Sequence, residues 1–358
     1  MSWYCSFLIF QPQEIDLVLS ICSDADWVIH FTVDPSRRYR FSRDGLGLST
    51  SYRSDSVIAC GPLMNGDQYG KLLVFHGDQN EVDNILDLIN SSLIVLRAYH
   101  EPDNSYVHAF ELPTDFKTRQ EVFRCIFRTD GFYQQFKYWL EMPAALALAA
   151  AAWKDKSVLY AIHKLAKSIR TECVTPDSMH PVHGQVFDKH SESHLEQVGT
   201  STAINLAFSA IQELQLDVKA SNAKPRWLDN GAYEWNPAVL TDLQERLRSV
   251  GIEDDSIFDW VTRGTPTEVE VHPIRDMLSE YSDGQVVRDV EYSFPDAINA
   301  CEYIRNFMTA HAFREKTTRL GPYEVCNVQQ VARRLVLSIL GMWRVWPKDL
   351  ERRYSQLS

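Results

Sequence analysis

The chain has 358 residues, of which 45% are hydrophobic and 11% aromatic, so its composition excludes a disordered chain and its length fits two domains. The formal net charge of −12 excludes a general nucleic-acid coating protein, because phosphate binding needs local positive potential. Residues 305–358 nevertheless hold ten Lys and Arg against three Glu and one Asp, so we expect contact with nucleic acid at one confined site.

Residues 1 to about 112 are predicted to form an α+β domain. One amphipathic helix is expected over about 81–89. Short runs of β-branched and aromatic residues, separated by turn-forming clusters, predict strands on either side of it. These runs are Tyr4–Phe10, Trp27–Val33, Val57–Cys60, Leu72–His76, Leu93–His100 and Tyr106–Leu112.

The rest of the chain, residues 117–358, is predicted to be an all-α bundle with an insertion at about 215–292. A linker rich in Pro, Asp and Asn precedes it at about 101–116. Apolar residues spaced three or four apart, together with capping residues, indicate the helices. These are Phe132–Leu140, Ala144–Trp153, Val158–Ile169, Leu195–Leu214, Asn236–Val250, Phe294–Phe313 and Pro322–Trp343. The fold class expected for the whole chain is therefore α+β.

The cysteines and the apolar segments indicate a cytoplasmic protein. Seven cysteines are scattered without a CxxC pair, which predicts neither a disulfide framework nor a cysteine zinc site. The apolar N-terminus lacks the basic region and cleavage site of a secretory signal. The alanine-rich run Met142–Ala152 is about half of the roughly 20 residues that a membrane span needs, so we expect a buried helix there.

The helix expected over 294–313 carries a short polar motif, Arg305-Asn306 followed by His311. Ser293 is a good N-cap, and Pro295 and Asp296 suit a first turn. At about 100° per residue, Arg305 and His311 fall at opposite edges of the apolar stripe and stand about 9 Å apart along the axis. One straight helix does not bring them together, so a shared site must be completed by a second helix or a second protomer, most simply by a twofold-related copy of the chain.

These residue types suit RNA cleavage without a metal. A histidine can take the proton of a ribose 2′-hydroxyl or give one to the leaving oxygen near neutral pH. An arginine can stabilise the charge that develops on the phosphorane. Asn306 could orient a phosphate or fix the arginine.

The segment Arg305-Asn-Phe-Met-Thr-Ala-His311 resembles the signature of the HEPN superfamily (higher eukaryotes and prokaryotes nucleotide-binding). The flanking segments 320–335 and Lys224-Pro-Arg-Trp also resemble bacterial HEPN proteins of uncharacterised or anti-phage type, so the likeness covers about residues 130–345. It implies a dimeric helical bundle acting as a metal-independent endoribonuclease without cofactor, in a toxin or anti-phage defence effector. Arg305 and His311 would be catalytic and Asn306 supporting. The alternative is a non-catalytic HEPN scaffold or a nucleotide- or RNA-binding dimerisation module.

The remaining candidates concern binding. Arg314, Lys316 and Arg319 directly follow the motif and are candidates for RNA phosphate contacts, although a solvated helix end is equally compatible with them. Trp227 and Trp235 could stack a base, but anchoring of the insertion is favoured. A histidine-rich loop over 179–194 lacks any recognised ligand spacing, so no metal is predicted. The expected partners are RNA, a second copy of the chain, and a regulatory protein or ligand at the N-terminal domain, whose role would be sensing; no membrane is expected.

Overall fold

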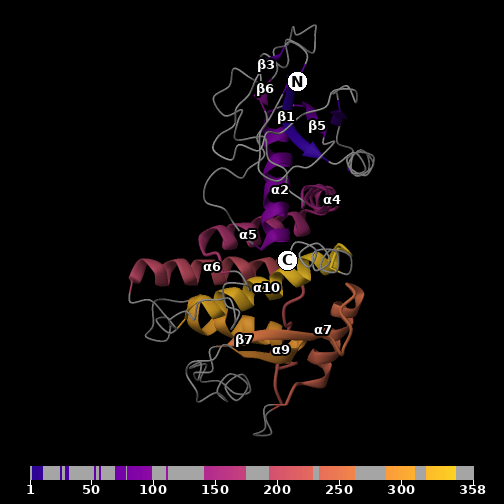
Figure 1. Cartoon of the computed structure of the whole chain (residues 1–358). Coiled ribbons are helices and arrows are strands. Elements are labelled where there is room, and N and C mark those ends of the chain that lie inside the picture. The colour runs from indigo at the N-terminus through magenta and orange to yellow at the C-terminus, as the bar shows by residue number, and fades with distance from the viewer. Residues whose placement is uncertain are drawn as a thin grey trace. The chain divides into compact units, whose positions relative to one another are not determined.

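The computed structural model describes residues 2–10, 25, 29–31, 52–53, 56–57, 69–77, 79–98, 110–111, 141–174, 193–228, 234–262, 288–310 and 320–343. The chain forms two compact units, one made of Met1–Leu93 and Glu101–Lys154 and the other of Ile94–His100 and Asp155–Ser358 (Figure 1). The described residues are mostly helical and include strands, in agreement with the predicted α+β class.

The first unit contains an antiparallel sheet of four strands in the order β2-β5-β1-β6. Its two long strands pair over nine residues each, from Ser2 opposite Gly77 to Phe10 opposite Tyr69. The strands of the sheet are β1 Ser2–Phe10, β2 Ile29–Phe31, β5 Tyr69–Gly77 and β6 Phe110–Glu111. A separate pair joins β3 (Tyr52–Arg53) to β4 (Ser56–Val57).

Helix α2 (Gln79–Arg97) corrects one prediction of strand. The run Leu93–His100 was expected to be extended because it is rich in β-branched and aromatic residues. In the structure α2 continues through it to Arg97, and every residue from 88 to 96 is buried. A helix that is buried all round shows a continuous apolar run, which sequence periodicity cannot distinguish from a buried strand.

Helix α4 (Met142–Trp153) confirms the buried helix that the alanine-rich run predicts. Nine of its residues are buried, and Pro143 lies in its first turn, where a proline is tolerated. Of the helices in the described part of the chain, none has both the length and the apolar character needed to cross a membrane.

The second unit is built on three helices, α5 (Lys156–Thr171), α6 (His194–Glu213) and α10 (Pro322–Ile339). The first two run antiparallel, since the Ser168 hydroxyl donates to the Ala203 carbonyl at 2.7 Å while Lys164 pairs with Glu213. The Gln329 amide of α10 donates to the Ser168 hydroxyl at 3.0 Å, which ties the third helix to the pair. Their facing sides bury the core residues Ile162, Leu165, Ile204, Phe208, Ile211 and Leu335.

The insertion contains a helix, as predicted, and an antiparallel pair of strands that was not predicted. Helix α7 (Pro237–Ser249) begins at Asn236 and ends before Gly251, as expected. Strands β7 (Ile257–Thr262) and β8 (Arg288–Ser293) then pair antiparallel. Alternate residues of β7 are buried, Phe258 and Trp260, and the Phe258 ring meets the Phe294 ring at 5.9 Å between centroids.

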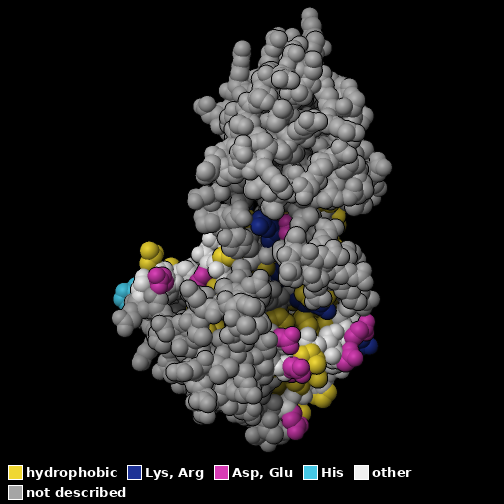
Figure 2. Space-filling view, viewed as in Figure 1, with side chains coloured by type: hydrophobic (Ala, Val, Ile, Leu, Met, Phe, Trp, Pro, Cys, Tyr) yellow, Lys and Arg dark blue, Asp and Glu magenta, His cyan; other side chains and the backbone are white. Residues whose placement is uncertain are grey.

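The exterior of this unit near α7 is acidic. The carboxylates of α7 and of the turn after it are exposed, and Figure 2 shows acidic side chains gathered on this side of the unit. They belong to Asp242, Glu245, Glu253, Asp254 and Asp255. Arg246 and Arg248 pair with Asp242 and Asp254, so this face carries five carboxylates against two arginines and is net acidic.

Candidate functional site

The motif lies on helix α9 (Phe294–Tyr303), which begins where the sequence predicts. The Ser293 hydroxyl accepts from the Asp296 backbone N–H at 3.3 Å, and Pro295 lies in the first turn. The indole N–H of Trp235 donates to Asp296 Oδ1 at 2.8 Å. The hairpin strand β8 runs directly into this cap, so the start of the motif helix is fixed from two sides.

Past Tyr303 the structure departs from the regular α-helix that the sequence predicts. Residues Ile304–Thr309 form a π-helical turn, η3, in which the Ala310 N–H donates to the Arg305 carbonyl at 2.8 Å. The regular α-helical geometry predicted for 294–313 is therefore wrong over Ile304–Thr309. Such turns are rare and occur frequently at functional sites.

A side chain of α6 explains why the turn is widened. The Asn205 amide donates to the Thr309 carbonyl at 3.3 Å, and its Oδ1 lies 2.7 Å from the Thr309 hydroxyl. That hydroxyl also lies 3.2 Å from the Arg305 carbonyl. Side-chain groups that take up helix backbone partners in this way interrupt the regular i to i−4 bonding.

The first two motif residues contact each other directly. Arg305 Nη1 donates to Asn306 Oδ1 at 2.7 Å, and Asn306 Nδ2 donates to Glu302 Oε1 at 3.2 Å. Both motif side chains are half-buried. Of the two roles considered for Asn306, this geometry favours fixing the arginine.

Glu302 is a site residue that sequence reasoning missed. It forms an ion pair with Arg226 of the insertion, and the two side chains keep only 12% and 18% of their surface exposed. Burial raises the pKa of Glu302, and the nearby carboxylate of Asp217 raises it further; Arg226 and the Val218 backbone N–H act in the opposite direction. The available signal was its place four residues before Asn306 in a predicted helix.

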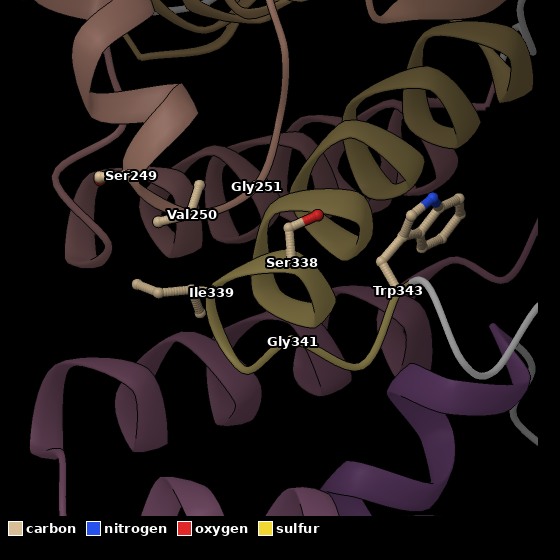
Figure 3. Close-up of a pocket in the computed structure, with 7 residues that line it drawn as sticks. All are labelled: Ser249, Val250, Gly251, Ser338, Ile339, Gly341 and Trp343. Carbon is tan, nitrogen blue, oxygen red and sulfur yellow. The ribbon is translucent and has the colours of Figure 1, made fainter.

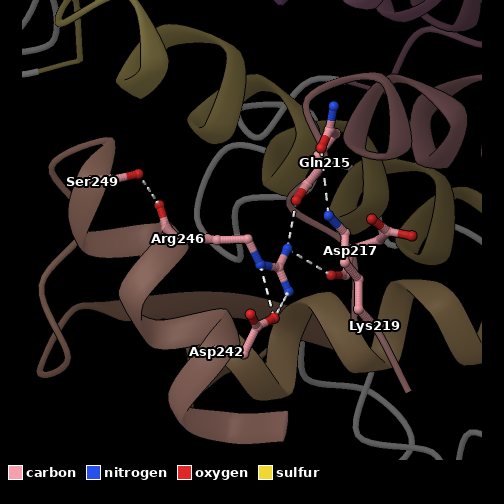
Figure 4. A network of polar contacts seen from close by, with 6 residues as sticks. All are labelled: Gln215, Asp217, Lys219, Asp242, Arg246 and Ser249. Atoms are coloured by element: carbon pink, nitrogen blue, oxygen red, sulfur yellow. Dashed lines mark hydrogen bonds and ion pairs between the residues drawn. The ribbon is translucent and has the colours of Figure 1, made fainter. Parts of the chain in front are cut away.

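Arg246 of α7 holds the chain segment that follows α6 (Figure 4). The Arg246 guanidinium donates to the carbonyls of Gln215 and Asp217 and pairs with Asp242 at 2.8 Å. Gln215 has a φ of 57°, so the chain reverses sharply at the end of α6. Arg246 thereby fixes the turn that brings Asp217 and Val218 beside Glu302.

The two tryptophans of the insertion anchor it, as predicted. Trp227 and Trp235 form an isolated antiparallel bridge and place their ring centroids 4.6 Å apart. Since Trp235 also bonds Asp296, the segment that carries Arg226 is attached to α9 at two points.

An aromatic pair lies on the same helix. Tyr303 and Phe307 stack with their centroids 4.7 Å apart and their planes at 24°. Tyr303 is buried, whereas Phe307 keeps 48% of its surface exposed. Phe307 is thus a single exposed aromatic beside the half-buried polar residues of the motif.

Several predicted residues lie outside the described part of the chain. They are His311, Arg314, Lys316 and Arg319, together with His180, His183 and His190 of the histidine-rich loop. Within the described ranges, no group of three or more His, Cys, Asp or Glu side chains is arranged to hold a metal ion.

A pocket of about 400 Å³ lies elsewhere in the second unit, between the ends of α7 and α10 (Figure 3). Both helices end in the same way, because Gly251 and Gly341 adopt φ values of 81° and 68° and their N–H groups bond back to the last turn. Trp343 forms part of the wall. No motif residue lines this pocket.

No family model, curated protein or solved structure matches this chain.

Proposed function

We propose that this chain is a metal-independent endoribonuclease of the HEPN type, in which Arg305 and His311 act together across a homodimer. The observation that carries the proposal is the way Arg305 is held. Its guanidinium gives one of five N–H donors to the neutral Asn306 amide. Among the described residues it makes no ion pair, so its positive charge is available for a phosphate.

The reaction that we propose is an internal transesterification. His311 takes the proton of a ribose 2′-hydroxyl, and the 2′-oxygen forms a bond to phosphorus. The bond from phosphorus to the 5′-oxygen breaks, and that oxygen receives a proton from the second histidine of the dimer. Arg305 stabilises the negative charge on the phosphorane oxygens in between. The products are a 2′,3′-cyclic phosphate, or the 3′-phosphate formed from it by hydrolysis, and a 5′-hydroxyl.

The charge distribution supports an approach of RNA at the motif and not elsewhere. The exposed acidic face near α7 repels phosphates, while residues 305–358 carry ten Lys and Arg. In this proposal Arg314, Lys316 and Arg319 supply contacts to neighbouring phosphates.

The biological role that we propose is a cytoplasmic toxin or anti-phage defence effector. An unregulated ribonuclease would degrade the RNA of its own cell, so we assign the N-terminal domain a sensing role toward a regulatory protein or ligand.

One observation favours a second candidate, a non-catalytic dimerisation or RNA-binding module. The half-exposed Phe307 offers an apolar surface on the motif helix itself, which a second copy or a nucleobase could cover. Both candidates use the same face, and only the first requires bond cleavage.

The deciding experiment compares wild type, Arg305→Ala and His311→Ala for cleavage of total RNA with EDTA present. We expect cleavage by wild type and by a control variant, and none by Arg305→Ala or His311→Ala, with 2′,3′-cyclic phosphate ends on the products. Arg248→Ala is the matched control, because Arg248 is 47% exposed and pairs with Asp254 away from the motif. Equal cleavage by all variants would disprove the assignment. A wild type that dimerises and binds RNA without cleaving it would establish the second candidate.

A further inference from the structure

The motif is connected to a buried carboxylate through a chain of four side chains. Arg226 pairs with Glu302, Glu302 accepts from Asn306, and Asn306 accepts from Arg305. The four belong to three segments, namely the insertion, α9 and the π-turn. Of the four residues, Arg226 and Glu302 lie outside the motif.

Each of these four side chains restricts the orientation of the next one. An ionised carboxylate only accepts hydrogen bonds, whereas an asparagine amide offers an acceptor on one side and donors on the other. Because Glu302 accepts, Asn306 turns its Nδ2 toward the carboxylate and its Oδ1 toward Arg305. A flipped amide would place two N–H donors against the guanidinium, which has no acceptor to offer.

The neutral amide also keeps two opposite charges apart. A carboxylate in direct contact with Arg305 would pair with it and compete with a phosphate for its donors. With Asn306 between them, Glu302 restricts the guanidinium and Arg226 balances the charge of Glu302. The four groups keep a net charge of +1 beside the motif, and that charge resides on Arg305.

We propose that Glu302 is a positioning residue, with Arg226 as its counter-ion, that fixes the Asn306 amide so that Arg305 is oriented and keeps its charge. This inference rests on the proposed ribonuclease function, for which Arg305 binds the scissile phosphate. The sequence Glu302-x3-Asn306 next to Arg305 is then part of the site, and the insertion contributes to it through Arg226.

The test measures the order of the Arg305 side chain and RNA cleavage in the same full-length variants. The Arg305 Nε–Hε resonance in NMR is identified by its absence in Arg305→Lys. In wild type we expect an order parameter close to that of rigid groups, about 0.85, and in Glu302→Ala a value below about 0.6. Glu302→Gln keeps the shape but lets the facing amides adopt either orientation, so it should give an intermediate value.

RNA cleavage should be slower in the variants in which the Arg305 side chain is less ordered. We expect kcat to fall roughly 10- to 100-fold in Glu302→Ala, as is typical when a group that orients an active residue is lost. Asn306→Asp should raise KM for RNA at least about tenfold, because the new carboxylate pairs with the guanidinium and has no N–H to donate to Glu302. Glu213→Gln is the matched control, since it removes a carboxylate from the Lys164 pair in the same bundle.

Two results would overturn the inference: an Arg305 as ordered in Glu302→Ala as in wild type, or full activity in Asn306→Asp. If wild type cleaves no RNA, the proposed function fails, and the order parameter alone then decides whether Glu302 holds Arg305. Melting temperatures identify any variant that fails to fold. If Glu302→Ala is such a variant, the order parameter of Arg305 in Glu302→Gln decides the question.

Discussion

Substitution of Arg226 by Met tests the energetics of the buried pair. The change removes the charge and keeps most of the aliphatic stem, so it leaves Glu302 without its counter-ion. Removing one partner of a buried ion pair costs about 3–5 kcal/mol. Glu302 keeps the Asn306 bond and 12% of its surface exposed. We therefore expect a loss of about 2–3 kcal/mol in the free energy of unfolding at pH 8.

The loss of stability in Arg226→Met should increase as the pH rises. The pKa of Glu302 in the folded protein lies above its usual value of 4.5 because of burial, and it rises further when Arg226 is removed. Above 4.5 and up to the folded pKa, the native state binds more protons than the unfolded state, so stability falls as pH rises through that window. The destabilisation by Arg226→Met should accordingly be smaller at pH 5 than at pH 8.

Urea denaturation at both pH values provides the measurement, and Glu302→Gln completes a double-mutant cycle. The double variant should be more stable than the sum of the single effects predicts, by about 1–3 kcal/mol, because the uncompensated charge is gone. A loss below about 0.5 kcal/mol at pH 8, or an equal loss at pH 5, would refute a buried pair whose charge is balanced by Arg226.

Four other substitutions test the geometry. Gly199 lies inside α6 and Gly341 has a φ of 68°, and an added Cβ meets nothing within 4 Å at either. Gly199→Ala should therefore stabilise by about 0.5–1 kcal/mol and Gly341→Ala should destabilise by about 1–2 kcal/mol in denaturation experiments; the same sign for both would contradict this. Trp235→Phe removes the bond to Asp296 and should cost about 1 kcal/mol, whereas Trp235→Phe combined with Asp296→Asn should cost little more. Asn205→Ala should lower both stability, by about 1–2 kcal/mol, and RNA cleavage, and unchanged cleavage would separate the π-turn from activity.

Local signals in the sequence predicted several elements well. The cap of Ser293, the cap of Asn236 and the stop at Gly251 depend on neighbouring residues only, and all three are present in the structure. The apolar spacing along α5 is also a local signal, and the residues Ile162, Leu165 and Ile169 that it places on one face are buried.

Features that depend on distant partners were not predictable. Val198 fits the apolar face of α6 but is 61% exposed, whereas the polar residues Gln197 and Thr200 beside it are buried. The pair of Arg226 and Glu302 joins segments far apart in the chain, and no spacing rule connects them.

Strands β7 and β8 and the π-turn were not predicted, for different reasons. The short alternation in Ile257–Thr262 is present in the sequence, but its partner strand begins only at Arg288. The π-turn depends on Asn205 of another helix, whereas the sequence of Ile304–Thr309 itself is compatible with an ordinary α-helix. Tertiary contacts decide both cases.

The π-turn also changes how the spacing between two residues in this helix relates to the directions of their side chains. A π-turn holds one residue more than an α-helical path between the same two ends. Ala310, which follows the turn, is offset by one helical step, about 100° and 1.5 Å, from the position that an unbroken helix would give. Deletion of one residue from Ile304–Thr309 should convert the turn to an α-helical one. The number of residues between Arg305 and His311 therefore does not by itself set the direction from one to the other.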